Sequence, residues 1–149
     1  MIDLESYNVV LLDIDTLIIE NKNFKTDINT MEIISYLSNK YLLYGITKYS
    51  KLEVYKYIKE LYLKTYFQDI ISTQMIELEN AKKLAGFIAK QTLNSDLSKT
   101  IFIGSDSLFQ TKLSKSIIDT CLINENCKQN PNSRVEYEVE NISKIKKYL

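Results

Sequence analysis

The feature that most constrains the fold is the stretch VVLLDIDTL, which runs from Val9 to Leu17. Its four consecutive branched aliphatic residues predict a strand that is covered on both faces, as in the parallel sheets of α/β domains. The strand leads directly into Asp13 and Asp15, so two carboxylates are expected at a buried edge. A fold retains such a pair when a cation, a shared proton or a substrate offsets the repulsion between the two charges.

Strand and helix patterns alternate along the rest of the chain. Further strands are predicted at 41–47, 69–72, 100–104, 120–124 and 135–139, the last as an edge strand. Helices are predicted at 29–39, from residue 50 to about 64, at about 77–93, at 108–116 and at 142–148. This alternation predicts a three-layer, doubly wound α/β fold with about five parallel strands and helices on both faces. No linker or repeat interrupts it, so a single domain is expected over residues 1–149.

Two of these helices carry recognisable start signals. Asn29 is a candidate N-cap for the first helix, with Glu32 three residues later. Ser50 and Glu53 have the spacing of a capping box at the start of the second helix. Gly86 interrupts the third helix, where glycine costs about 1 kcal/mol relative to alanine, and this predicts close packing at that position.

Composition excludes several classes of function. The formal charge of the 149 residues is zero, so no nucleic-acid-binding field is expected, and no apolar stretch approaches the roughly 20 residues of a membrane span. The N-terminal sequence is too polar for a signal peptide. Cys121 and Cys127, without any histidine, are too few for a zinc site, and we expect free thiols in a reducing cytoplasm. Any general acid or base must therefore be a carboxylate, a lysine or a tyrosine.

Polar residues follow the most apolar strands at their carboxyl ends. Asp13 and Asp15 follow the first, Thr47 ends the second, and the turn Gly104-Ser105-Asp106-Ser107 follows the strand at 100–104. Ligands of open parallel sheets bind outside these ends, near the point where the strand order reverses. We therefore expect one shallow pocket in which carboxylates hold an oxygen-preferring cation and hydroxyls hold an anion.

These residues resemble the motifs of the haloacid dehalogenase superfamily, whose members are mostly magnesium-dependent phosphatases and phosphotransferases. The likeness covers the whole chain. The first motif, an apolar strand followed by Asp-x-Asp, is matched by Asp13 and Asp15, and the second, a strand ending in a phosphate-binding hydroxyl, by Thr47. A lysine at the start of a later helix is matched by Lys82 or Lys83.

The fourth motif of that family, a strand followed by a magnesium-binding aspartate, is matched loosely by IFIGSDSLF. The resemblance implies that Asp106 is a magnesium ligand together with Asp13 and the main-chain carbonyl of Asp15. It also implies supporting roles for Ser105, Ser107 and Gln110 around the site.

By the same resemblance, Asp13 is the nucleophile that attacks phosphorus, and Asp15 is the general acid and base. Thr47 and one of the two lysines hold the phosphoryl oxygens. Only about a dozen residues separate Asp15 from the next predicted helix, too few for the large helical cap of many relatives. The expected substrate is a small-molecule or macromolecular phosphomonoester, and an open site of this kind suits a bulky phosphate or needs a partner chain to close it. Neither the identity of the substrate nor the oligomeric state can be inferred.

Two alternatives to a phosphatase remain. The family usually has a threonine where this chain has Leu17, and an aspartate where it has Ser105. These differences are compatible with a catalytically degenerate relative that binds phosphate, a metal or another protein. A response-regulator-like receiver also gathers aspartates at such an edge, although its order of acids, threonine and lysine fits less well.

Tyrosines and lysines are interleaved between residues 36 and 66. Such mixtures can form a stacking platform for single-stranded nucleic acid. Both residue types are abundant throughout the chain, however, so ordinary amphipathic helix faces with extended lysines are the favoured interpretation.

Overall fold

The computed structural model describes residues 6–74, 81–93, 96–105, 118–123, 137–139 and Ile145. Six strands form one sheet in the order β3-β2-β1-β4-β5-β6, and every neighbouring pair is parallel. They are β1 (Val9–Asp13), β2 (Leu42–Thr47), β3 (Asp69–Ser72), β4 (Thr100–Gly104), β5 (Asp119–Ile123) and β6 (Tyr137–Val139). The predicted α/β class is confirmed. The edge strand predicted at 135–139 is present as β6, which pairs in parallel with β5, so the sheet has six strands where about five parallel ones were expected.

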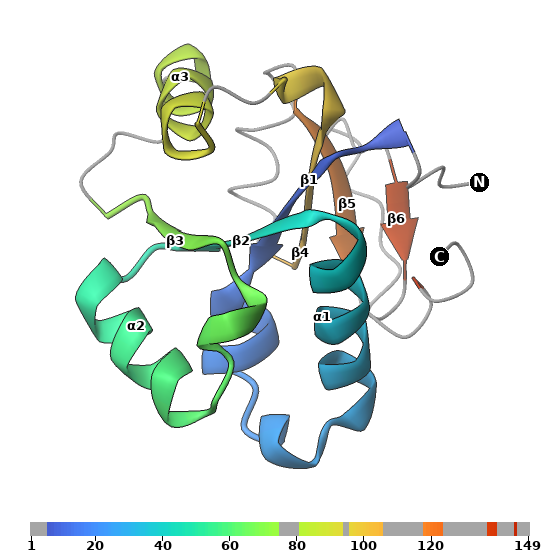
Figure 1. Ribbon diagram of the computed structural model, residues 1–149, viewed down its shortest axis with the longest axis vertical. Coiled ribbons are helices and arrows are strands. Elements are labelled where there is room, and N and C mark those ends of the chain that lie inside the picture. Colours follow the sequence, from blue (N-terminus) through green and yellow to red (C-terminus); the bar gives the residue numbers. More distant parts are fainter. Residues whose placement is uncertain are drawn as a thin grey trace.

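Helices cover both faces of the sheet (Figure 1). The helices α1 (Ile28–Lys40) and α2 (Lys51–Glu60) lie on one face, and α3 (Ala81–Gln91) lies on the other. A π-helix (Asp15–Ile19) follows β1, and short 3-10 helices occupy Phe24–Thr26, Lys64–Tyr66 and Leu97–Lys99. The strand order runs outward from β1 in one direction and from β4 in the other. The reversal therefore falls between the carboxyl ends of β1 and β4.

Two helix boundaries differ from the predictions. Asp27, not Asn29, caps α1, because its carboxylate accepts a hydrogen bond of 3.1 Å from the Thr30 amide. The helix α2 ends at Glu60 instead of about residue 64. Tyr62 has a φ of 58°, and this left-handed turn directs Leu63 into the core. The predicted cap of α2 is confirmed, since the Glu53 amide donates to Ser50 Oγ at 3.3 Å.

The predicted helices at 108–116 and 142–148 lie outside the described residues, apart from the buried Ile145. Cys121 is a buried free thiol in β5, and burial raises its pKa to about 12. Among the described helices, none is long and apolar enough to cross a membrane.

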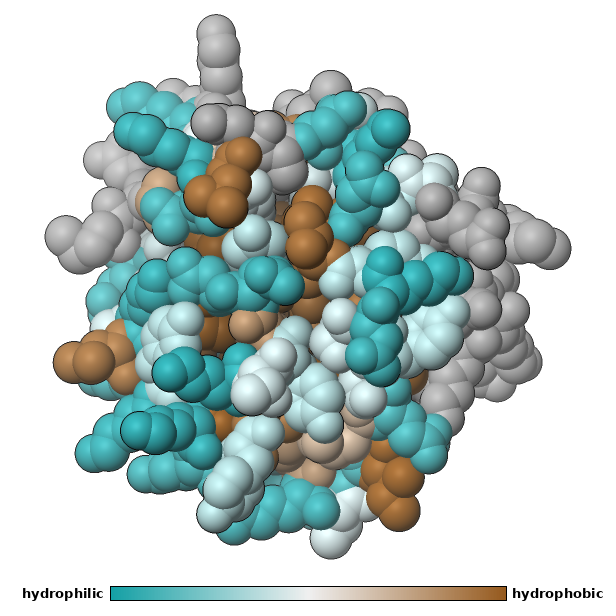
Figure 2. Space-filling view, viewed as in Figure 1, coloured by the Kyte–Doolittle hydropathy of each residue, from teal (hydrophilic) through white to brown (hydrophobic). Residues whose placement is uncertain are grey.

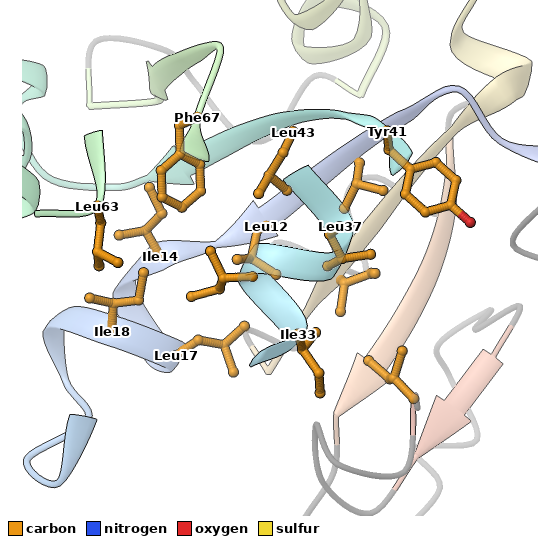
Figure 3. Close-up of a cluster of buried hydrophobic side chains, with 14 of the residues drawn as sticks. Leu12, Ile14, Leu17, Ile18, Ile33, Leu37, Tyr41, Leu43, Leu63 and Phe67 are labelled. Carbon is orange, nitrogen blue, oxygen red and sulfur yellow. The ribbon is translucent and has the colours of Figure 1, made fainter. Parts of the chain in front are cut away.

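The core consists of two clusters, one on each face of the sheet, because successive strand residues point to opposite faces. Val10 and Leu12 pack toward α1 and α2, whereas Val9 and Leu11 pack toward α3. Figure 3 shows the first cluster, in which Leu12 and Leu43 from the sheet meet Ile33 and Leu37 of α1. Figure 2 shows that hydrophilic residues cover most of one face of the molecule, with hydrophobic side chains scattered among them.

Gly86 does not mark close packing, contrary to the prediction from its place in the helix. A Cβ atom built there would meet no atom within 4 Å, and the residue is exposed on α3. Gly86→Ala should therefore raise the free energy of unfolding by about 1 kcal/mol, since alanine loses less backbone entropy in a helix. Urea unfolding monitored by circular dichroism measures the change. An unchanged or lowered stability would contradict this placement.

Candidate active site at the carboxyl edge

The two aspartates of the DID motif lie at the point where the strand order reverses. Asp13 is the last residue of β1, and Asp15 begins the π-helix that follows. Both are buried, with relative exposures of 3% and 5%. Buried carboxylates are rare unless they are hydrogen-bonded or paired. The contacts of each oxygen therefore indicate what the site can do.

The Asp13 carboxylate is held by two main-chain amides from distant parts of the chain. The Thr16 amide donates to Oδ1 at 3.1 Å, and the Ser105 amide donates to Oδ2 at 3.0 Å. One donor belongs to the turn after β1, and the other to the turn after β4. Amide donors stabilise the ionised carboxylate without neutralising it. Asp13 is thus positioned as a fixed anion that faces the carboxyl edge.

Gly104 makes this approach of β4 to Asp13 possible. A Cβ atom on Gly104 would overlap the Asp13 Cβ, and it would lie 2.8 Å from Asp13 Oδ2 and 2.7 Å from Phe102 Cζ. Only glycine lets the Ser105 amide reach the Asp13 carboxylate at this point. The glycine of the GSDS turn therefore shapes the site through backbone proximity.

Asp15 is bound to the end of the neighbouring strand β2. Thr47 Oγ1 donates to Asp15 Oδ1 at 2.5 Å, and the Lys48 amide donates to Asp15 Oδ2 at 2.8 Å. Burial raises the pKa of Asp15 above its ordinary value, although the hydrogen bonds from Lys48 and Thr47 oppose the rise. The charge of Asp13 raises this pKa further. A carboxyl group with a raised pKa can hold a proton and release it, as a general acid and base must.

The raised pKa has a consequence for stability in metal-free protein. Between pH 3.8, the ordinary pKa, and the higher folded value, native Asp15 keeps a proton that the unfolded chain has lost. The free energy of unfolding should therefore fall as the pH rises through this window. Urea unfolding of the wild type and of Asp15→Asn, measured at several pH values in a chelating buffer, isolates the contribution of Asp15 to the free energy of unfolding. If the difference between the two proteins does not vary with pH, the folded pKa is not raised.

The π-helix fixes the aspartates through its apolar residues. Its hydrogen bond runs from the Glu20 amide to the Asp15 carbonyl at 2.7 Å. Ile14, Leu17 and Ile18 point into the core cluster beneath the sheet (Figure 3). The apolar Leu17, which departs from the family motif, is thus a core residue that anchors this turn.

Glu20, which follows the π-helix, also connects β1 to the residues after β2. Its Oε1 accepts a hydrogen bond of 3.0 Å from the Tyr49 hydroxyl and forms an ion pair of 3.3 Å with Lys48 Nζ. Partial burial lowers the pKa of Lys48, but its contact with Glu20 outweighs this effect and raises the pKa. The lysine therefore stays protonated, and its charge lies near Asp15, whose pKa it lowers.

The structure brings some of the predicted site residues together and leaves others undescribed. Asp13, Asp15, Thr47 and the Ser105 amide converge through the contacts above. Lys83 is exposed in the first turn of α3, where Lys82 also lies, and the Lys82 side chain is not described. The remaining predicted residues, Asp106, Ser107 and Gln110, lie outside the described residues.

Sequence reasoning did not identify Lys48, Tyr49 or Glu20 as part of this edge. Lys48 and Tyr49 directly follow Thr47, and the end of a central strand is the one signal that could have singled them out. The role of Lys48 depends partly on its main-chain amide, which any residue other than proline supplies. Side-chain identity therefore carries little information about that contact.

The donors at this edge are compatible with a hard cation such as Mg²⁺. Asp13 supplies carboxylate oxygens and Asp15 a main-chain carbonyl oxygen, and each of these oxygens has a lone pair beyond the one that accepts a hydrogen bond. Within the described part of the chain, no group of three acidic, histidine or cysteine side chains gathers as a metal site. A third carboxylate would have to come from outside it, and Asp106 directly follows Ser105 in the sequence.

Several solved structures share this architecture. A predicted phosphatase from Clostridium acetobutylicum superposes on 95% of this chain and 97% of its own, with 14% identity and a TM-score of 0.72. A haloacid dehalogenase-like hydrolase from Streptococcus pneumoniae covers 97% and 99%, with 13% identity and a TM-score of 0.70. A HAD-type hydrolase from Bacillus subtilis, bound to magnesium, covers 78% and 53%, with 21% identity and a TM-score of 0.69.

This chain therefore spans about half the length of the Bacillus protein and nearly all of the other two. No protein-family model matches the sequence, and no curated protein matches it. The fold itself is clear from the solved structures. The chain has the fold of the haloacid dehalogenase superfamily, as the sequence motifs predict.

Proposed function

We propose that the chain is a magnesium-dependent phosphohydrolase that cleaves a phosphomonoester through an aspartyl-phosphate intermediate. One observation carries the proposal. Two buried aspartates lie at the reversal of strand order, one held as an anion by main-chain amides and the other given a raised pKa by burial. The fold supports it, because solved structures with this fold include a predicted phosphatase and a magnesium-bound hydrolase.

In this proposal the Asp13 carboxylate attacks phosphorus in line, and the bond from phosphorus to the leaving oxygen breaks. Protonated Asp15 gives its proton to that oxygen, and the alcohol departs. Ionised Asp15 then takes a proton from water, which attacks the phosphorus of the aspartyl phosphate and releases inorganic phosphate. Asp13 returns as a carboxylate and Asp15 as an acid, so the cycle closes.

Three further groups would support this reaction: a bound Mg²⁺, the Thr47 hydroxyl and one lysine. Asp13, the Asp15 carbonyl and Asp106 would hold Mg²⁺, which when bound supplies positive charge against the phosphoryl oxygens. Thr47, together with Lys82 or Lys83, would hold those oxygens. Because the Thr47 hydroxyl donates to Asp15, Asp15 must release that proton donor before Thr47 can bind phosphate. In this proposal residues 1–149 form a single domain that acts without a substantial cap over its site.

The test is direct detection of the intermediate. The protein is incubated with 4-nitrophenyl phosphate and Mg²⁺, quenched in acid, and digested for mass spectrometry. We expect the peptide that contains Asp13 to gain the mass of one phosphoryl group, and a chelator to abolish both this adduct and turnover. Turnover without an adduct on Asp13 would contradict the mechanism.

A second candidate is a non-catalytic domain that binds phosphate or a metal. It is favoured by the hydrogen bonds that already hold the site, since each carboxylate oxygen of Asp13 and Asp15 accepts one from the protein itself. Such a domain would bind Mg²⁺ in a titration without hydrolysing any phosphomonoester.

A further inference from the structure

A hollow opens between α2 and the end of the π-helix that begins at Asp15. Its volume is about 210 Å³, and its lining residues are Ile19, Tyr49, Glu53, Val54 and Tyr57. Ile19 ends the π-helix, Tyr49 lies just beyond β2, and the others occupy the first two turns of α2. In Figure 1 the π-helix lies in blue between α2 and α1.

The segments that begin at Asp15 and follow Thr47 both continue into the walls of this hollow. The Tyr49 amide donates to Thr47 Oγ1 at 3.1 Å, and the same hydroxyl donates to Asp15. On the other side, Ile19 belongs to the turn that begins at Asp15. The walls of the hollow are therefore continuous along the chain with the segments that hold Asp15 and Thr47.

We propose that this hollow holds the leaving group of the substrate, and that this leaving group is a single aromatic ring. The inference rests on the proposed function and adds a substrate class to it. Tyrosine rings pair with other rings in offset or edge-to-face geometry, and Ile19 and Val54 add apolar surface. A cavity of about 150 Å³ in another protein holds one benzene molecule, so the volume here suits one ring with a substituent.

The charges around the hollow restrict that substituent. Glu53 lines the hollow, and in the described part of the chain no salt bridge to its side chain is found. Glu20 is paired with Lys48 and accepts a hydrogen bond from the Tyr49 hydroxyl. This hydrogen bond holds the Tyr49 ring in place as one wall of the hollow. A carboxylate in the hollow repels an anionic substituent and attracts a hydrogen-bond donor. The ring is therefore neutral or carries a donor group.

The experiment uses phosphonates, which bind without being hydrolysed. Calorimetric titration in Mg²⁺ should show that benzylphosphonate binds about tenfold more tightly than methylphosphonate, because the ring is removed from water. Tyr57→Ala should remove most of this preference. Tyr62→Ala is the matched control, since Tyr62 is 88% exposed and does not line the hollow, and it should keep the preference. Tyr57→Leu, which keeps an apolar side chain, is the second variant if Tyr57→Ala does not fold.

A second comparison tests the charge. 4-Carboxybenzylphosphonate should bind severalfold more weakly than benzylphosphonate. Glu53→Gln should reduce this difference in affinity between the two phosphonates. Equal binding of benzylphosphonate and methylphosphonate overturns the inference while the proposed function stands. If the protein binds neither phosphonate and hydrolyses no phosphomonoester, the proposed function fails and the inference fails with it.

Discussion

Asp13→Asn should lower the turnover of 4-nitrophenyl phosphate by about 10⁴-fold or more, because an amide oxygen does not form the covalent intermediate. Both oxygens of Asp13 accept main-chain amides, so the new NH₂ group must face one of these donors. A loss of about 1–3 kcal/mol in stability is therefore expected as well. Steady-state kinetics and urea unfolding measure the two effects separately.

A matched variant controls for the general effect of the substitution. Asp96 is exposed and caps a short 3-10 helix, a role that asparagine also fills. Asp96→Asn should keep both turnover and stability. Turnover by a folded Asp13→Asn protein within tenfold of the wild type would mean that Asp13 is not the nucleophile.

Asp15→Asn should separate the two halves of the same reaction. Nitrophenolate leaves without much need for a proton, whereas water must lose one before it attacks the aspartyl phosphate. The variant should therefore release one equivalent of nitrophenol in a burst and then turn over slowly. Stopped-flow absorbance at millisecond resolution follows the burst. Loss of turnover without a burst would remove Asp15 from the second step.

Gly104→Ala should damage both the packing of the sheet and the site. The added Cβ would overlap the Asp13 Cβ and crowd the Phe102 ring in a fully buried layer. Overpacking of this kind costs about 1–3 kcal/mol, and relief by moving β4 would take the Ser105 amide away from Asp13. We therefore expect lower stability and, at temperatures where the protein stays folded, lower turnover.

The same chemical change at Gly86 provides the contrast, because a methyl group meets open space there. Urea unfolding of the two variants in parallel should show changes of opposite sign. If Gly104→Ala were as stable and active as the wild type, β4 would not approach Asp13 as described.

Much of the fold could be predicted because its strands are short, apolar and separated by helical patterns. The strands at 69–72 and 100–104 have the predicted bounds, and Asp13 and Asp15 do lie at the carboxyl edge. The Asn29 cap was wrong because Asp27, two residues earlier, offers a carboxylate to the same turn. Local sequence preference does not distinguish two neighbouring cap candidates when the choice depends on where the chain enters the core.

The partners of the site residues were harder to predict than their positions. The hydrogen bond from Thr47 to Asp15 depends on how the ends of β1 and β2 line up in the sheet. The main-chain contacts of Lys48 and Ser105 depend in the same way on the register of β2 and β4 relative to β1. Main-chain donors leave no trace in residue type. The π-helix after β1 was likewise not predictable. It forms because Ile14, Leu17 and Ile18 are buried together, and that burial depends on the packed core as a whole.

The two amides that hold Asp13 both follow it along the chain, one three residues later and the other 92 residues later. A polypeptide still emerging from the ribosome would have the aspartate and the first donor long before β4 exists. Reactivity at this carboxylate is thus linked to completion of the sheet. Shortened products of translation that end before β4 would carry the DID sequence without the hydrogen bond from the Ser105 amide.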